Sequence, residues 1–400
     1  MSGLSIGYYY HLPAKIINGR IYTAGPQGCF IDSLAALCER IYCFLYAPRE
    51  SELETLDYQI QSVNVELVGI GPHTSVMNLA FSSRAFTRPL REYLPRLDAV
   101  LLRGPSPLLP QMAAAAGHTP VVLLLVGNYL TNIDNLPQPR WRKEAIRLWA
   151  MWNQWGERNV ARRCLTFVNS RELYQDLKPI VTRLVETRTT TLHEEDFHQR
   201  EDACEASPYR LLYTGRMDRT KGLFEIVEAL SLLVSQGLDV TLDLVGASSR
   251  NDPIVEELRA FALNKGIEDR VRYQGFKPLG PELFSYYKNA DIYITAAISS
   301  EGFPRTLWEA MSHGAPIITT RVGSIPYFLT DRENALLVAP RSAREISEAV
   351  KLLLEDRALR RAMIQNAYLL AKENTLERRA GEMIDQIKLS LAGEAQKDAR

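Results

Sequence analysis

The 400-residue sequence lacks the features that mark several large classes of protein. Lys and Arg together number 47, and so do Asp and Glu, so there is no positive excess of the kind that binding to nucleic-acid phosphates requires. No apolar run approaches the length of about 18 residues that a membrane-spanning helix needs, and the run Val121–Val126 is only strand-length. The sequence therefore argues against a dedicated nucleic-acid-binding protein and against a membrane-spanning one.

Cysteine is scarce and irregularly placed. The five cysteines form no C-x-x-C pair, so they fit neither a disulfide framework nor a zinc site, and we expect reduced, mostly buried thiols. The first residues have neither a charged leading segment nor a long apolar core before a small-residue cleavage site, so they do not resemble a secretion signal. We therefore expect the chain in the cytoplasm.

Short apolar runs alternate with longer amphipathic segments along the whole chain. Runs that are apolar throughout are typical of parallel strands covered by helices on both faces, and the alternation predicts βαβ units. We therefore predict an α/β fold with two doubly wound, Rossmann-like domains facing each other across a cleft, where ligands of such sheets bind. The expected strands are 4–10, 66–70, 99–102, 121–126, 165–168, 209–213, 240–245, 271–273, 292–295, 317–319 and 336–338, and the expected helices of the second half are 222–236, 253–264, 305–312 and 342–354.

A change in composition separates the two halves. Residues 193–208 are polar and acidic and end in Pro directly before a new strand, so we predict a linker there. The N-terminal domain would span 1–200 and the second domain 201–375. Residues 376–400 would form a C-terminal helix and tail, because the helical pattern has no strand after it, and one place for this helix is against the N-terminal domain.

The loop after the first strand of the second domain combines two cations with two glycines. It runs from Gly215 to Gly222 and contains Arg216 and Lys221 at a strand-to-helix turn. The free N–H groups at a helix start carry partial positive charge, to which Arg adds a planar fork and Lys a point charge. The pattern predicts an anion site, and the alternative is a solvated loop.

Two carboxylates follow the strand expected at 292–295. Gly302 and Pro304 make Glu301 a loop residue and begin the next helix. Glu309 then points back from the second turn of that helix. Carboxylates accept hydrogen bonds from hydroxyls, which suits a ribose or a sugar ring. The alternative is that Glu301 only complements the helix dipole and that Glu309 is a surface residue.

Together these segments resemble the retaining nucleotide-sugar glycosyltransferases of family four (glycosyl transferases group 1), which have the GT-B fold. The resemblance covers most of 209–340 and depends on the order of its motifs, above all on two glutamates separated by seven residues, downstream of an Arg and a Lys. The segments that carry it are GRMDRTKG, LVGAS, VRYQGF, YYKNADIYIT, EGFPRTLWEAMSHGAPIITT, VGSIP and DRENALLV.

The resemblance implies catalytic roles for Arg216, Lys221 and Glu301. The two cations would bind the donor diphosphate, Glu301 the hydroxyls of the donor sugar, and Glu309 the nucleotide ribose. The Gly275–Phe276 turn would lie near the base. The implied donor-binding residues are Gly215, Gly246, Phe276, Gly302, Phe303, Pro304 and Glu309.

The chain also departs from this family. Pro304 stands where many members have a second glycine, which removes an N–H donor but suits a first helical turn. The first domain resembles the family only in outline, and it has Arg103 and Gly127 where many members have histidines.

Three residues of the first domain are acceptor-side candidates, because we expect each of them just after a strand: His11, Arg103 and Asn128. The alternatives are that Arg103 and Asn128 only form turns after their strands, and that His11 has a structural role. The glycine-bearing segment 18–28 is expected to be a loop that could close over the substrates.

Residues 140–163 combine basic residues with tryptophans. Seven cations stand against two acids, Glu144 and Glu157. The cations are Arg140, Arg142, Lys143, Arg147, Arg158, Arg162 and Arg163, and the tryptophans are Trp141, Trp149, Trp152 and Trp155. Basic residues with interfacial aromatics favour anionic membrane surfaces, so one interpretation is peripheral contact with the inner face of the membrane. The other is that the tryptophans pack against the sheet while the arginines are solvated.

We therefore predict a retaining glycosyltransferase that moves a sugar from a nucleoside-diphosphate sugar to a hydroxyl of a glycan or lipid-linked acceptor, in polysaccharide or glycolipid biosynthesis. Retention is implied by the resemblance alone. We expect no metal, cofactor or nucleic-acid partner, because fixed cations can stabilise a diphosphate and the sequence has no aspartate cluster of the metal-bridging type. Two alternatives stay open: a non-catalytic nucleotide-sugar-binding partner subunit, which the missing histidines favour, and a nucleotide-sugar 2-epimerase.

Overall fold

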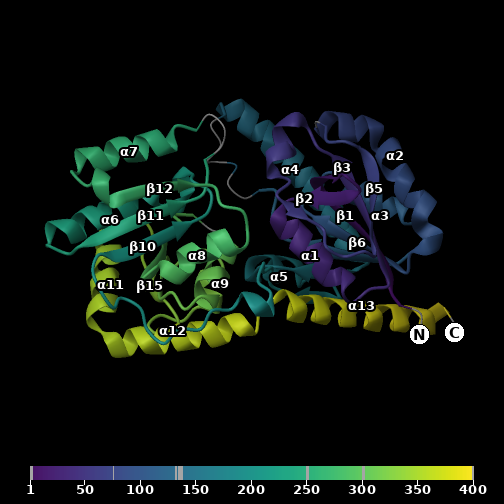
Figure 1. Ribbon diagram of the computed structural model, residues 1–400. Helices are drawn as coiled ribbons and strands as arrows, with labels where there is room; N and C mark the ends of the chain where they lie inside the picture. Colours follow the sequence, from purple (N-terminus) through teal and green to yellow (C-terminus); the bar gives the residue numbers. More distant parts are fainter. Residues whose placement is uncertain are drawn as a thin grey trace. The chain divides into compact units, whose positions relative to one another are not determined.

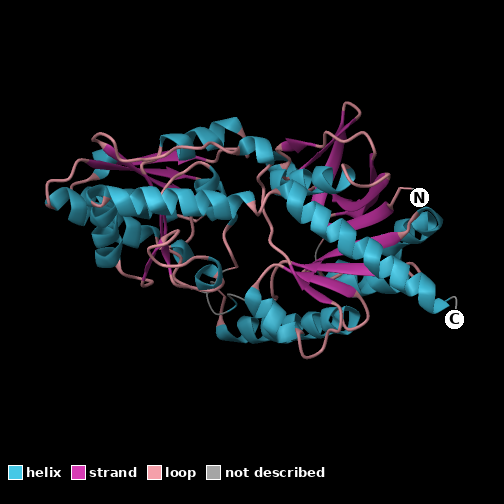
Figure 2. Ribbon diagram, turned by 90° about the horizontal axis from the view of Figure 1, so that it is seen from below, coloured by secondary structure: helices cyan, strands magenta, loops and turns pink. Residues whose placement is uncertain are grey.

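The structure is a computed structural model, and it describes residues 3–74, 76–130, 133, 138–248, 252–299 and 302–398. The chain divides into two compact units, one made of 1–189 with 376–400 and the other of 190–375, which we call the N-terminal and C-terminal units. In each unit helices cover a sheet, as Figure 1 and Figure 2 show. The prediction of an α/β fold with two Rossmann-like units is confirmed.

The sheet of the N-terminal unit is built on a parallel core in the order β5-β3-β1-β6-β7-β8-β9. β2 pairs antiparallel with the second half of β1, and β4 pairs with β2. The strands are β1 Ser5–Ile17, β2 Arg20–Thr23, β3 Arg40–Ala47, β4 Tyr58–Gln59, β5 Val65–Pro72, β6 Ala99–Gly104, β7 Val121–Leu125, β8 Leu165–Val168 and β9 Leu184–Glu186. The helices are α1 Gly25–Ala35, α2 Val76–Tyr93, α3 Leu109–Ala115, α4 Arg140–Ala161, α5 Arg171–Leu177 and α13 Leu376–Asp398.

The N-terminal sheet differs from the prediction, which also lacked the short strands β4 and β9 at its margins. The prediction missed β3, whose six central residues are all buried between β1 and β5. The segment 18–28 is not a loop, because β1 and β2 form a hairpin across Asn18 and Gly19 and α1 begins at Gly25. The φ angles of 51° and 77° at the two turn residues are those that Asn-Gly favours in a tight hairpin. The expectation of a closing loop is therefore wrong.

The sheet of the C-terminal unit is parallel throughout, in the order β12-β11-β10-β13-β14-β15. This is the doubly wound order of a Rossmann fold, in which the chain reverses direction across the sheet between β10 and β13. The strands are β10 Tyr209–Thr214, β11 Val240–Val245, β12 Val271–Gly275, β13 Ile292–Thr295, β14 Ile317–Thr320 and β15 Leu336–Val338. The helices are α6 Leu223–Ser235, α7 Ile254–Asn264, α8 Pro281–Asn289, α9 Arg305–Ser312, α10 Ile325–Phe328, α11 Ala343–Glu355 and α12 Arg357–Lys372.

Two apolar cores hold this sheet, and the alternation of side chains along the strands decides which core each residue joins. Leu211 and Leu242 pack with α6, α7 and α11 in one core. Leu212 and Tyr293 pack with α8, α9 and α12 in the other. All five cysteines are free thiols, and all of them except Cys38 are buried, as expected.

Helix α13 joins the core of the N-terminal unit although it follows the whole C-terminal unit in sequence. Met383, Ile384 and Ile387 are buried in one cluster with Ile31 and Leu34 of α1. Figure 1 shows α13 running beside α1. The apolar side chains recur at helical spacing, and the N-terminal unit supplies the surface that covers them.

We expect Ile387→Ala to lower the free energy of unfolding of the N-terminal unit by about 2 to 5 kcal/mol, because the change leaves a cavity in a fully buried contact. Leu389→Ala on the same helix is the matched control, since its side chain is exposed, and it should change the value by less than about 0.5 kcal/mol. Urea unfolding followed by tryptophan fluorescence measures both. Equal effects of the two substitutions would contradict this placement of α13.

Candidate functional site

The carboxyl ends of β10, β11 and β12 carry glycines whose backbones lie in direct contact. The Gly215 N–H donates to the Val245 carbonyl at 3.0 Å, and the Gly246 N–H donates to the Gly275 carbonyl at 2.9 Å. A Cβ atom on Gly246 would lie 1.8 Å from the Gly215 oxygen, and the φ of 143° also favours glycine. Three successive loops are therefore held together at one edge of the sheet.

The loop from Gly215 to Gly222 is fixed at its far end as well. Asp218 caps the short 3-10 turn Arg219–Lys221, with its Oδ1 accepting from the Thr220 N–H at 2.9 Å. Gly222 then adopts a left-handed conformation with φ of 66° and begins α6. A Cβ atom there would lie 2.0 Å from the Ala296 oxygen, next to the end of β13. The loop therefore spans from β10 to the switch point of the sheet.

The cations of this loop differ in their surroundings. The Arg216 side chain is 82% exposed, and its nearest carboxylate oxygen, on Asp218, is 3.8 Å away. Arg219 instead forms a short ion pair with Glu257 on α7. Arg216 is therefore placed to meet an anion from solvent, whereas Arg219 is already neutralised by a neighbour.

Glu309 is buried on α9, with 5% of its surface exposed. Its Oε1 accepts from the Thr191 hydroxyl at 2.9 Å and its Oε2 from the Tyr287 hydroxyl at 2.6 Å. Burial, and then the neighbouring Glu309 charge, hold the pKa of Tyr287 well above its ordinary value, so that hydroxyl stays a donor. The alternative of a surface carboxylate is wrong. Neither partner could be predicted, since Thr191 precedes Glu309 by 118 positions and Tyr287 precedes it by 22.

The other donor-side residues follow two parallel strands of the same sheet, β12 and β13. Phe276 follows β12 and is 59% exposed. Pro304 caps α9, which begins one residue later, as predicted. The Phe303 ring packs 4.4 Å from that of Trp308, and Gly302 before it is exposed. Glu301 lies outside the described residues.

Two of the acceptor-side candidates lie inside strands rather than after them. His11 is within β1, at a shift in its pairing with β3 between Tyr9 and Pro13. Arg103 is within β6, with its guanidinium 4.7 Å from the centre of the Tyr10 ring. Burial, together with the charges of His73 and Arg103, lowers the pKa of His11 to about 4. His11 and Arg103 are thus neighbours, and the histidine is neutral at pH 7.

Asn128 follows β7 as expected, and its side chain closes its own turn. The Oδ1 atom accepts from the Leu130 N–H at 2.9 Å. In the preceding residue, a Cβ atom on Gly127 would meet the Pro105 ring at 3.5 Å. The loops after β6 and β7 are therefore adjacent at the carboxyl edge of the N-terminal sheet.

Glu157 is a buried acid behind these two loops that the sequence analysis missed. It lies on α4 with 4% of its surface exposed, and its Oε1 accepts from the Ser106 N–H at 2.9 Å. Burial raises the pKa of its carboxyl to about 7, against the opposing effect of the Ser106 N–H. Burial and the Glu157 charge also raise the pKa of Tyr129, in the loop after β7. Within a basic segment, Glu157 had no signal that separated it from a surface acid.

No group of three or more His, Cys, Asp or Glu side chains in the described part of the chain is placed to hold a metal ion. In the same residues, no helix has the length and apolar character needed to cross a membrane.

The fold of this chain is that of the GT-B glycosyltransferases. The structure of Anabaena Alr3699/HepE in complex with UDP superposes with a TM-score of 0.72 at 17% sequence identity, covering 96% of this chain and 99% of that one. The sucrose-phosphate synthase from Thermosynechococcus elongatus does so with a TM-score of 0.73 at 19% identity, covering 98% and 100%. At these identities the likeness concerns the fold.

The match to a family model lies within the C-terminal unit. Residues 195–370 match the family model described as Glycosyl transferases group 1, which confirms the resemblance for that part of the chain. A D-inositol 3-phosphate glycosyltransferase from Arthrobacter sp. (strain FB24) is 29% identical over 168 residues, which are 42% of this chain and 39% of that protein. The chain thus covers less than two thirds of the length of this curated relative.

We expect the free energy of unfolding to depend on pH through Glu157. Because its folded pKa lies above the ordinary carboxyl value, the folded state favours the protonated form, and this stabilisation is lost as pH rises through about 7. Between about pH 5 and 8 the free energy of unfolding of the wild type should therefore decrease, by a few kcal/mol at most, and Glu157→Gln should make this decrease smaller.

Urea unfolding at several pH values measures this slope. Glu144→Gln, which removes an exposed acid from the same helix, is the control and should keep the slope of the wild type. An unchanged slope in Glu157→Gln would show that the carboxyl does not bind a proton on folding.

Proposed function

We propose that the chain is a retaining glycosyltransferase that moves a sugar from a nucleoside-diphosphate sugar to an acceptor hydroxyl in polysaccharide or glycolipid biosynthesis. The observation that carries this is the anchored loop Gly215–Gly222, with its exposed Arg216, inside the segment that matches the glycosyltransferase model. The structurally similar HepE has been determined with UDP and with UDP-glucose, which supports a nucleotide-sugar donor.

In this proposal the loop stabilises the leaving diphosphate. The cations of Arg216 and Lys221 meet the negative charge that develops on the phosphate oxygens as the glycosidic bond breaks. Because the glycine contacts fix the loop beforehand, little reorganisation is needed at the moment of reaction. Two fixed cations supply the charge that a divalent metal provides in other enzymes, so the proposed reaction is metal-independent.

The two glutamates bind the two other parts of the donor, the ribose and the transferred sugar. Glu309 accepts from the ribose hydroxyls, and Glu301 accepts from the hydroxyls of the transferred sugar. The Tyr287 and Thr191 hydroxyls support this role, because they hold the Glu309 carboxylate in one orientation. Backbone groups at Gly302 and Phe303 would line the sugar pocket, and Phe276 would contact the base.

On the acceptor side, His11, Arg103 and Asn128 would position the acceptor hydroxyl. A neutral His11 supports this, since a neutral imidazole can accept a proton or a hydrogen bond. The alternative to this enzyme is a non-catalytic nucleotide-sugar-binding subunit. The donor would raise the thermal stability of such a subunit, but the subunit would not turn the donor over.

Replacing Arg216 or Lys221 should slow transfer without unfolding the protein. We expect Arg216→Ala and Lys221→Ala each to lower kcat/KM for donor turnover by roughly 10² to 10³, because each removes charge that stabilises the leaving diphosphate. Arg219→Ala in the same loop is the control, since its side chain is already paired with Glu257, and it should lower kcat/KM less than about threefold. Wild-type rates in both Arg216→Ala and Lys221→Ala would sink the assignment.

The second part of the proposal concerns α4, whose outer face is apolar. Three of its tryptophans, Trp141, Trp152 and Trp155, are 68%, 63% and 63% exposed, and Leu148 between them is 64% exposed. Their spacing of seven, four and three residues places them on one stripe of the helix. The buried face instead contains Asn153 and Glu157. The alternative in which the tryptophans pack against the sheet is therefore wrong for these three, whereas Trp149 packs on Tyr129.

We propose that this stripe docks on an anionic lipid surface, where a lipid-linked acceptor would be available. Arg147 and Arg158 are paired with Glu144 and Asp176. The remaining arginines of the segment that are exposed and form no ion pair with a described residue are Arg140, Arg142, Arg162 and Arg163. Tryptophan rings insert favourably into the interfacial zone of a bilayer, and the neighbouring cations are attracted to its anionic headgroups.

Vesicle cosedimentation tests this surface. Wild-type protein should bind phosphatidylglycerol-rich vesicles at low ionic strength and be released as salt rises. The triple substitution Trp141→Ala, Trp152→Ala and Trp155→Ala should weaken the partition at least about tenfold, because three interfacial rings are lost. Leu263→Ala, an exposed apolar residue on α7 of the other unit, should leave it unchanged. Absence of wild-type binding at low salt would exclude membrane docking.

A further inference from the structure

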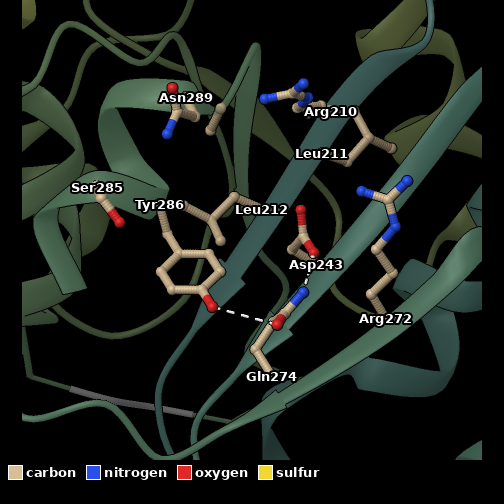
Figure 3. Close-up of a pocket in the computed structure, with 10 residues that line it drawn as sticks. Arg210, Leu211, Leu212, Asp243, Arg272, Gln274, Ser285, Tyr286 and Asn289 are labelled. Carbon is tan, nitrogen blue, oxygen red and sulfur yellow. Dashed lines mark hydrogen bonds between the residues drawn. The ribbon is translucent and has the colours of Figure 1, made fainter. Parts of the chain in front are cut away.

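A polar cavity of about 200 Å³ lies on the C-terminal unit, on the sheet face that α8 partly covers (Figure 3). Arg210 and Arg272 on its rim are the second residues of β10 and β12, whereas the glycine loops follow the opposite ends of these strands. The arginine rim of the cavity is therefore separate from the glycine loops of the candidate donor site, whereas Gln274 in the cavity floor directly precedes Gly275. The lining residues are Arg210, Leu211, Leu212, Asp243, Arg272, Gln274, Ser285, Tyr286, Asn289 and Ala290.

The strands under this cavity do not have the composition of a fully covered parallel sheet. In β11 the polar Thr241 and Asp243 alternate with Leu242 and Leu244, and β12 alternates in the same way. In the register of the sheet, Asp243 pairs with Leu212 on one side and with Arg272 on the other. Parallel strands between two helical layers are normally apolar throughout, so this corner presents polar groups to a ligand or to water.

Hydrogen bonds fix the floor of the cavity in one arrangement. The Tyr286 hydroxyl donates to Gln274 Oε1 at 3.1 Å, and Gln274 Nε2 donates to Asp243 Oδ1 at 2.6 Å, as the dashed lines in Figure 3 show. The Gln274 amide is thereby oriented, and Asp243 keeps acceptor capacity for a further hydroxyl.

Two guanidinium groups stand at the rim beside this network. Figure 3 shows the Arg272 side chain beside Asp243 and the Arg210 side chain farther along the rim. Within the described part of the chain, no hydrogen bond or ion pair holds either guanidinium. Two cations against one carboxylate leave the cavity with an excess of positive charge, which favours an anionic ligand.

We propose that this cavity binds a monosaccharide unit that carries a carboxylate or a phosphate group. The volume is somewhat larger than the roughly 150 Å³ cavity that holds a benzene ring, so it has room for one substituted six-membered ring. The two arginines meet the anionic group, Asp243 and Asn289 meet hydroxyls, and the Tyr286 ring offers an apolar face to the sugar. Such a unit occurs as a residue of an acidic glycan or as a free sugar phosphate.

Isothermal titration calorimetry with glucuronate, glucose 6-phosphate, glucose and inorganic phosphate tests the proposal. Wild-type protein should bind at least one of the two acidic sugars tenfold or more tightly than glucose and than phosphate. Binding of glucuronate assigns the site to an acidic glycan, and binding of glucose 6-phosphate alone assigns it to a free sugar phosphate. Failure of both acidic sugars to bind, or equal binding of phosphate, overturns the proposal.

Variants separate recognition of the anion from recognition of the sugar. Arg210→Gln with Arg272→Gln should weaken binding of the acidic sugar tenfold or more, whereas Arg344→Gln, an exposed arginine on α11, should not change it. Asp243→Asn should weaken binding of the acidic sugar relative to binding of inorganic phosphate, because it replaces the carboxylate acceptor for a sugar hydroxyl, whereas the loss of a negative charge favours both anions alike. An unchanged affinity of the double variant would overturn the proposal.

The inference does not depend on the proposed donor chemistry. Donor turnover by the Arg210→Gln and Arg272→Gln double variant should remain at the wild-type level, since neither residue lies in the glycine loops. Loss of sugar binding with donor turnover intact supports the cavity alone, and loss of both in a protein with an unchanged thermal midpoint would contradict its separation from the donor site.

Discussion

The C-terminal unit depends on backbone contacts that only glycine permits. Gly246 lies against the Gly215 carbonyl and Gly222 against the Ala296 carbonyl, at separations that would place any Cβ atom inside a neighbouring oxygen. These contacts draw the loops after β10, β11 and β13 into one rigid edge. The orientation of the Arg216 backbone and the start of α6 both follow from this edge, so an anion would meet groups that are already in place.

Local signals in the sequence were sufficient for the strands and the loops of this unit. The strands β11, β13 and β15 had the predicted bounds, because each is short, mostly buried and flanked by turn residues. The start of α9 directly after Pro304 could also be predicted, because proline favours the beginning of a helix. The partners of Glu309 could not be predicted, since Thr191 and Tyr287 reach it only through the tertiary fold.

The N-terminal unit was harder to predict because polar side chains lie within its strands and on the buried face of a helix, where apolar ones are usual. His11 and Arg103 lie in strands that continue past the apolar run, into positions where aromatic rings cover the polar groups. Helix α4 buries Glu157 and exposes three of its four tryptophans, so the aromatic residues of this segment do not mark the side that faces the sheet. The spacing of apolar residues in a sequence indicates the type of secondary structure, but the burial of a carboxylate depends on the groups that pack around it in the folded protein.

The placement of α13 also has a consequence for the order in which the protein can form. The N-terminal sheet and α1 are synthesised first, yet residues 376–398, which cover Ile31 and Leu34, are translated only after the entire C-terminal unit. The early part of the chain therefore holds an uncovered apolar surface throughout the synthesis of the second unit, and it completes its core last. A chain of this topology relies on the second unit folding by itself in the meantime, or on a chaperone that shields the exposed surface until the last helix arrives.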